Sequence, residues 1–174
     1  EVCKEQTADF GHAKIKHVMI YTFEKGLLLN NRTPASTLEA VYSIPFALAY
    51  WVKYGAIEPE DLMCEDRFVR DPDVLDLATR IDMEHKSDYT GEFPLRCIQD
   101  IKVTWQDGTE WTMNELESPG DAGERAFSDE EMLKKFKTLC EPVVGEKYKD
   151  IAHMIEKLEL VTDVSFFVGA MVVS

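Results

Sequence analysis

A few basic side chains near the start of the sequence are the residues best suited to chemistry. His12, Lys14, Lys16 and His17 lie close together, and Arg32 follows further along the chain. Cationic side chains hold carboxylates and other anions, and arginine does so through two parallel hydrogen bonds. The formal net charge is −14, so an anionic ligand would have to be held by this local cluster against the field of the whole chain. The solvent-exposed face of a strand is the simpler interpretation of Lys14 and Lys16.

The other reactive side chains do not form a recognisable catalytic motif. The sequence has no glycine-rich phosphate loop, no GxSxG turn and no HExxH segment. Ser43 has no histidine near it in the sequence, which favours a packed hydroxyl over a nucleophile. No metal site is predicted, because a group of aspartates lacks the spacing of a calcium loop and is explained by helix capping and solvation: Asp66, Asp71, Asp73 and Asp76.

Composition excludes several classes of protein. An acidic chain does not suit nucleic acid, and no apolar run approaches the roughly 20 residues of a membrane span. The four cysteines have no CxxC spacing, which predicts a reducing compartment, the cytoplasm or an organelle matrix. The first residue, Glu1, is followed by neither a signal-peptide pattern nor an apolar run, so we expect a piece of something longer or a processed chain.

The segment from Arg32 to Gly55 carries the most distinctive local pattern. Apolar residues recur there at helical spacing, yet Pro45 lies within the pattern, where proline removes a backbone hydrogen bond. Two interpretations fit equally well. Either the helix is kinked in order to place a group, or it starts late, with Pro45 in its first turn.

The remaining pattern predicts an α+β fold with helices packed on an antiparallel sheet, followed by a carboxy-terminal helical tail. Alternation predicts strands over 14–23, 80–86, 97–105 and 109–113, the last two joined by a hairpin at 106–108. Caps predict helices near 58–63, after Asp71 and after Ser128, then a helix around 151–158. The apolar end, 164–173, is expected to dock against another surface.

Several segments, taken in order, resemble the carboxy-terminal half of the MmgE/PrpD family. They are RTPASTLEAVYSIPFALA, a glycine that ends that helix, RDPDVLDLATRI, the strand before Asp107-Gly108, SDEEMLKKFKTLCEPVV and LELVTDVSFF. That family includes 2-methylcitrate dehydratases, cis-aconitate decarboxylases and iminodisuccinate epimerases. The resemblance begins at about Lys14 and covers nearly the whole chain after it.

The resemblance implies a lid domain over residues 1–120 and a helical tail over 121–174 that packs on a helical domain missing from this chain. It implies a lyase or isomerase that acts on small di- or tricarboxylates. The whole enzyme would be a homodimer. The chemistry would be acid/base dehydration, decarboxylation or epimerisation without a cofactor. The catalytic residues are expected in the missing amino-terminal domain, so this segment alone is expected to be inactive.

In this chain the resemblance points to Arg32, Ser43 and Phe46 as substrate-binding residues. Phe46 stands where the family often has a tyrosine that can face the cleft, so a hydroxyl group is lost. The context around His12 does not match the family's histidine motif. The loss at Phe46 leaves a second function open, that of a non-catalytic binding or regulatory module that retains the lid fold.

Overall fold

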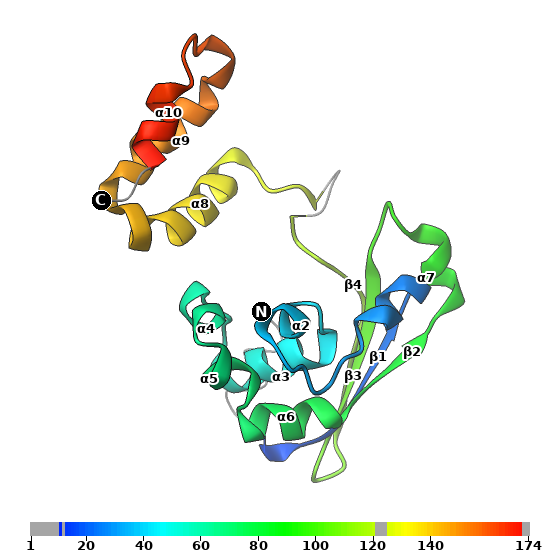
Figure 1. Cartoon of the computed structure of the whole chain (residues 1–174). Coiled ribbons are helices and arrows are strands. Elements are labelled where there is room, and N and C mark those ends of the chain that lie inside the picture. The colour runs from blue at the N-terminus through cyan, green and yellow to red at the C-terminus, as the bar shows by residue number, and fades with distance from the viewer. Residues whose placement is uncertain (1–10, 12, 121–124, 172–174) are drawn as a thin grey trace. The chain divides into compact units, whose positions relative to one another are not determined.

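The structure is a computed structural model that describes residues 11, 13–120 and 125–171. Contacts divide the chain into two compact units, Glu1–Ser118 and Pro119–Ser174. The described residues contain no helix that is long and apolar enough to cross a membrane. The predicted α+β class, helices packed on a sheet with a helical region after it, is confirmed (Figure 1).

The first unit is built on a four-stranded sheet in the order β2-β1-β3-β4. The strands are β1 (Ile15–Thr22), β2 (Ile81–His85), β3 (Ile98–Trp105) and β4 (Glu110–Glu117). Antiparallel pairing joins β1 to β3 and β3 to β4, whereas β1 and β2 run parallel. The purely antiparallel sheet expected from the sequence is therefore wrong at β2. The chain between β1 and β2 crosses the sheet through several helices, and such a crossover returns the next strand in the same direction.

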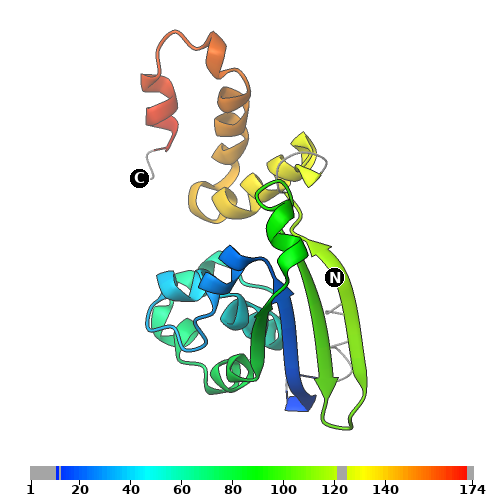
Figure 2. The same cartoon turned by 90° about the vertical axis from the view of Figure 1, so that its right-hand side faces the viewer.

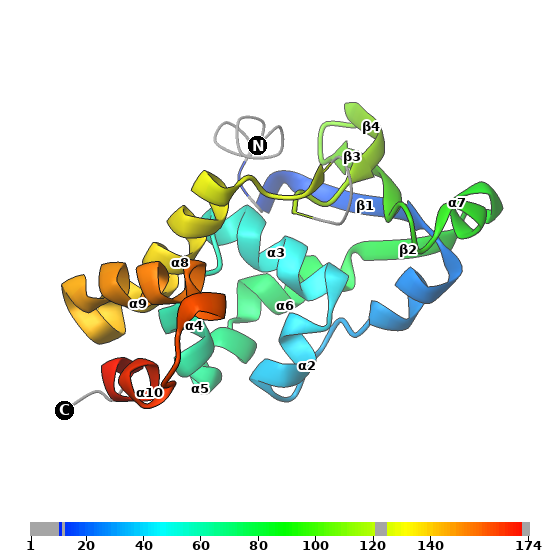
Figure 3. The ribbon, with the colours of Figure 1, turned by 90° about the horizontal axis from the view of Figure 1, so that it is seen from above.

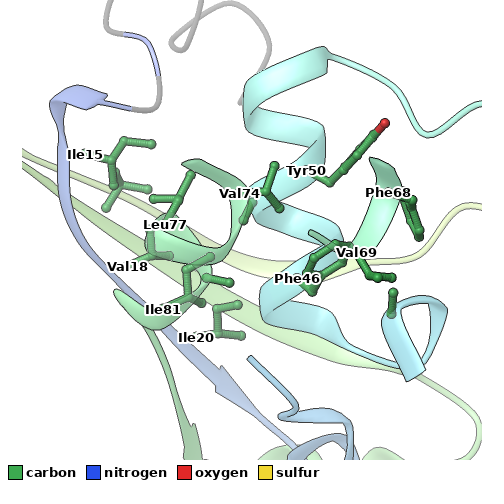
Figure 4. Packing of buried hydrophobic residues seen from close by; sticks show 14 of the residues in the cluster. Ile15, Val18, Ile20, Phe46, Tyr50, Phe68, Val69, Val74, Leu77 and Ile81 are labelled. Carbon is green, nitrogen blue, oxygen red and sulfur yellow. The ribbon is translucent and has the colours of Figure 1, made fainter. Parts of the chain in front are cut away.

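Short helices cover one face of this sheet (Figure 2). They are η1 (Glu24–Leu29), α2 (Thr37–Val41), α3 (Ile44–Tyr54), α4 (Pro59–Met63), α5 (Glu65–Val69) and α6 (Pro72–Thr79). The core lies where α3, α5 and α6 meet the strands (Figure 4). Burial of one large apolar side chain contributes roughly 1.5–3 kcal/mol, so this cluster is the main source of stability of the unit. Its largest members are Ile15, Val18, Ile20, Phe46, Tyr50, Phe68, Val74, Leu77 and Ile81.

At one end of the sheet, α7 (Ser87–Glu92) contacts β3 and η1. Phe23, Tyr89 and Ile98 form a second, smaller core there. Beside it, Lys86 Nζ contacts an oxygen of Asp100 at 2.7 Å, and the other oxygen accepts hydrogen bonds from the Tyr89 hydroxyl and, at 2.9 Å, from the Glu115 N–H. Burial raises the pKa of Asp100, but these hydrogen bonds outweigh it and lower the pKa below its usual value. Asp100 therefore works as an ionised anchor for this end of the sheet.

The segment with Pro45 consists of two helices, which decides between the two interpretations left open above. Ser36 caps α2 and Ser43 caps α3, accepting a hydrogen bond from the Phe46 N–H at 3.1 Å. Pro45 lies in the first turn of α3, where no backbone donor is lost. The helix starts late and is not kinked. Its other end is Gly55, whose φ of 79° is a left-handed conformation that glycine adopts without strain.

The second unit is helical. It contains α8 (Asp129–Val144), η3 (Gly145–Lys147), α9 (Tyr148–Glu156), η4 (Leu158–Leu160) and α10 (Ser165–Met171). The predicted capping box of Ser128 and Glu131 opens α8, and α8 contacts α9 (Figure 3). Tyr148 and Ile151 are the buried apolar side chains among the described residues of this unit. An open groove of ≈ 360 Å³ between α8 and α9 is lined by Met132, Leu133, Phe136, Ala152 and Ile155, with Asp129 and Glu156.

Candidate functional site

A short loop before α2 brings the three predicted site residues into one neighbourhood. The Ser43 hydroxyl donates to the carbonyl oxygen of Asn31, the residue before Arg32, and accepts from the N–H of Phe46. The Asn31 side chain holds the loop from within, since its amide donates to Glu39 at 3.1 Å and its oxygen accepts from the Thr33 N–H at 3.1 Å. The start of α3 and the position of Arg32 are thus linked through a single backbone carbonyl.

The Arg32 guanidinium extends from this loop to β2. Its Nη2 lies 2.6 Å from Oδ1 of Asp82, and 33% of the Arg32 side chain remains exposed. Nε contacts the Asn30 side-chain oxygen at 3.5 Å. Arg32 is therefore held in place by one ion pair, yet a third of its side chain is exposed. Such a group can bind a carboxylate from solution.

His17 is the second partner of Asp82. Nε2 of His17 lies 2.8 Å from Oδ2 of Asp82. Asp82 pairs with Met19 in the parallel register, which puts it and His17 on the face of the sheet opposite to Val18. The hydrogen bond from His17, followed by the charge of Arg32, lowers the pKa of Asp82, although partial burial acts in the opposite direction. The result is an ionised carboxylate between an arginine and a histidine side chain.

Other members of the predicted basic cluster do not join this site. Lys14 and Lys16 are exposed, but only Lys16 lies on strand β1, as the simpler interpretation has it, because Lys14 precedes that strand. His12 lies outside the described residues. His85 contacts the Thr90 hydroxyl at 2.8 Å, and His153 lies 3.9 Å from Glu156 in the second unit. Of the cluster members that the structure describes, His17 and Arg32 are brought together, and they meet through an aspartate from a distant strand.

Ser43 and Phe46 are closed to a ligand in the first unit as the structure describes it. Ser43 is 2% exposed, and Phe46 is 0% exposed. The ring of Phe46 packs edge-on against Phe68, with centroids 5.4 Å apart, and lies 6.3 Å from the ring of Tyr50. The two residues therefore support the loop and the core rather than an open surface. Arg32 is the predicted site residue that remains accessible.

The aspartates predicted to be structural have structural partners. Asp71 caps α6 and contacts Lys53 at 2.7 Å. Asp66 pairs with Arg70 at 3.0 Å, and Asp76 pairs with Arg80 at 2.7 Å. Among the residues that the structure describes, no three histidines, cysteines or acidic residues are grouped so that they could hold a metal ion. These aspartates serve helix caps and ion pairs.

Comparison with known families decides the assignment. The sequence model of the MmgE/PrpD C-terminal domain matches residues 1–160. The chain belongs to the MmgE/PrpD family. A search of curated proteins finds no match to the sequence. Members of the MmgE/PrpD family are enzymes, and a lyase-type enzyme part is consistent with the match.

Sequence reasoning missed Asp82, the residue that organises the accessible site of this MmgE/PrpD C-terminal domain. Its signal was weak but present. In the alternating segment after Arg80, Ile81 takes an inward position, which leaves Asp82 on the outward face. What the sequence did not contain was the pairing of β2 with β1, because that pairing depends on the parallel crossover.

Proposed function

We propose that the chain is the lid part of a MmgE/PrpD-type lyase or isomerase that acts on small di- or tricarboxylates. The family match over residues 1–160 supports the enzyme class, and the partly exposed, well-held guanidinium of Arg32 supports an anionic ligand. Arg32 is the observation that carries the proposal, because it opposes the net charge of −14 at one accessible point. We assign Arg32 to the binding of a substrate carboxylate, and Ser43 and Phe46 to the support of its loop.

The proposed chemistry is cofactor-free acid/base catalysis. Removal of a proton next to a carboxylate builds up negative charge on the substrate, and loss of water, loss of CO₂ or reprotonation follows. Such a reaction needs a base and an acid on either side of the substrate, together with cations that hold its carboxylates. We assign the base and acid to the helical domain of the family, and the carboxylate-holding cation to this lid.

The proposed partner of the second unit is that helical domain. Apolar side chains are exposed on several of the unit's helical segments, and few of its described residues are buried. A surface of this kind is typical of an interface. The exposed residues include Met132, Leu133, Leu139, Val143, Ile155, Leu158, Leu160, Val164 and Val168. We further propose that the whole enzyme is a homodimer in the cytoplasm or an organelle matrix.

The second candidate function is a binding or regulatory module without catalysis. Phe46 favours it, because a buried phenyl ring supplies no hydroxyl to a reacting group. The two candidates separate on one measurement. Turnover of cis-aconitate or 2-methylcitrate by the whole protein that carries this chain supports the enzyme. Binding of the same acids without turnover supports the module, and turnover by the 174-residue chain alone contradicts the need for a helical domain.

The Arg32→Ala variant of the whole protein tests the role of Arg32. A charge-assisted hydrogen bond contributes about 1.5–3 kcal/mol, so we expect the KM for cis-aconitate or 2-methylcitrate to rise roughly 10- to 100-fold. Steady-state kinetics and thermal unfolding check this result. The matched control is Arg96→Ala, which breaks a surface pair with Glu117 at 2.5 Å and is expected to leave the KM unchanged. A loss of stability in Arg32→Ala with an unchanged KM would mean that Arg32 only fixes its own loop.

A further inference from the structure

The carboxylate of Asp82 is shared by an arginine and a histidine from different parts of the fold. Arg32 Nη2 approaches Oδ1 at 2.6 Å, and His17 Nε2 approaches Oδ2 at 2.8 Å. Arg32 comes from the loop before α2, and His17 comes from β1. The side chains of Arg32, His17 and Asp82 are 33%, 37% and 46% exposed. One negative charge thus serves two partners on an open surface.

Asp82 differs in this respect from the buried aspartates of the same unit. Asp71 also accepts two backbone N–H groups at the start of α6, and Asp100 also accepts one from Glu115. Their side chains are only 10% and 9% exposed. In the described part of the chain, the hydrogen bonds to the Asp82 carboxylate come from His17 and Arg32 alone. Asp71 and Asp100 are fixed in the fold, whereas Asp82 can release a partner without leaving a buried charge.

Release of Arg32 from Asp82 is energetically accessible. An exposed ion pair stabilises a protein by at most a small amount, because water competes for both charges. A carboxylate from solution can therefore replace Asp82 at the guanidinium. After that exchange Asp82 still has His17, so its charge does not remain without a partner.

We propose that Asp82 is an exchangeable counter-ion that holds Arg32 when no substrate is present and passes it to a substrate carboxylate on binding, while His17 retains Asp82. This inference rests on the proposed function, because it assumes that Arg32 binds the substrate. It adds that Asp82 competes with the substrate for Arg32. It also adds that His17 remains the partner of the Asp82 carboxylate after Arg32 has left.

The electrostatic surroundings of His17 include further charges on the same sheet face. Glu84 follows Asp82 on β2, and Lys102 on β3 lies opposite Met19 and pairs with Glu110 of β4 at 2.9 Å. The Arg80 guanidinium donates hydrogen bonds to the carbonyl oxygen of Ile15 and to the carboxylate of Asp76. Lys102 and Arg80 already have acidic partners. Asp82 is the acidic group in hydrogen-bond contact with His17.

The experiment uses the 174-residue chain and L-tartrate, a small dicarboxylate that stays fully ionised between pH 6 and 8. Binding is followed by NMR and by calorimetry. The variants are Arg32→Ala, Asp82→Asn and His17→Gln. Asp66→Asn is the matched control, since it removes the same charge and breaks an exposed aspartate–arginine pair, that with Arg70.

We expect Arg32→Ala and Asp82→Asn to change the affinity for tartrate in opposite directions. Arg32→Ala weakens tartrate binding at least about tenfold, whereas Asp82→Asn tightens it by about two- to fivefold, the range set by the strength of an exposed ion pair. His17→Gln removes the imidazole that retains Asp82 and therefore weakens tartrate binding, and Asp66→Asn leaves the affinity unchanged.

Other outcomes overturn the inference in distinguishable ways. If Asp82→Asn weakens tartrate binding, Asp82 positions Arg32 for the ligand and does not compete with it. If Asp66→Asn tightens binding as much as Asp82→Asn, the effect comes from the overall charge and not from exchange. In both cases, weaker tartrate binding by the Arg32→Ala variant leaves the proposed function standing. If Arg32→Ala binds tartrate as the parent does, both the exchange and the proposed role of Arg32 are wrong.

Discussion

Replacing Phe46 with alanine is expected to lower the free energy of unfolding of the first unit by about 3–5 kcal/mol, the usual cost of removing a buried phenyl ring. The ring is 0% exposed and packs against Phe68 and Tyr50 where α3 meets α5. The alanine would leave a cavity that these neighbours fill only in part. Urea unfolding followed by tryptophan fluorescence measures the loss, because Trp105 belongs to the same core.

A matched control and a second variant sharpen this prediction. Leu38→Ala on α2 removes a side chain that is 68% exposed, and such surface changes usually stay within about 0.5 kcal/mol. Phe46→Tyr adds a hydroxyl to the core, and an unpaired buried hydroxyl costs about 1–3 kcal/mol. A Phe46→Tyr variant as stable as the parent would contradict the buried position and would support the cleft-facing position that the family resemblance implies.

Much of the secondary structure followed from local signals in the sequence. The hairpin at 106–108 was predictable because Asp107 accepts from the Thr109 N–H and Gly108 has a φ of 85°, both of which are local properties of the turn. The start of α8 was equally local, since Ser128 and Glu131 form a capping box within a single turn. Patterns of this kind depend on neighbours in the sequence and need no knowledge of the fold.

The features that the sequence did not predict depend on contacts between distant segments. The helices α5 and α7 are short, and the packing of Phe68 and Tyr89 into the two cores supports them more than their own propensity does. The parallel pairing of β2 with β1 requires the whole crossover, so Asp82 could not be placed beside His17 in advance. The late start of α3 was one of two open interpretations, and it depends on the bond from Ser43 to Asn31.

The accessible site shows the same difference between what local sequence signals predict and what depends on contacts between distant segments. Arg32 was found from its residue type and from the resemblance, but its partner Asp82 was not. Ser43 and Phe46 were assigned to substrate by resemblance, whereas burial places them in support of the loop and core. A sequence pattern reports which residues occur together. It does not report which of them faces solvent once the apolar pattern is divided between two helices, α2 and α3.

Replacing Asp71 with asparagine is expected to lower the free energy of unfolding by about 2 kcal/mol at pH 7 and to make that loss depend on pH. One oxygen of Asp71 accepts from Lys53 Nζ at 2.7 Å and from two N–H groups of α6, and the other contacts the Tyr54 hydroxyl. Burial raises the pKa of Asp71, but the hydrogen bonds from Lys53, Tyr54 and the Val74 N–H outweigh it and hold the pKa at about 2. Asparagine also caps helices well, so the variant removes the charge and keeps the cap.

The sign of the pH dependence follows from this lowered pKa. The carboxyl has a lower pKa in the folded chain than in the unfolded chain, so its contribution is complete above the unfolded value of 3.8 and is lost as the pH falls towards 2. The difference in unfolding free energy between the parent and Asp71→Asn should therefore be constant from pH 7 to about 5 and fall by roughly half at pH 3. Urea unfolding at each pH measures it. Asp66→Asn, whose carboxylate is 82% exposed, should show no such change. A difference for Asp71→Asn that stays the same from pH 7 to 3 would mean that the link between α3 and α6 does not depend on the charge of Asp71.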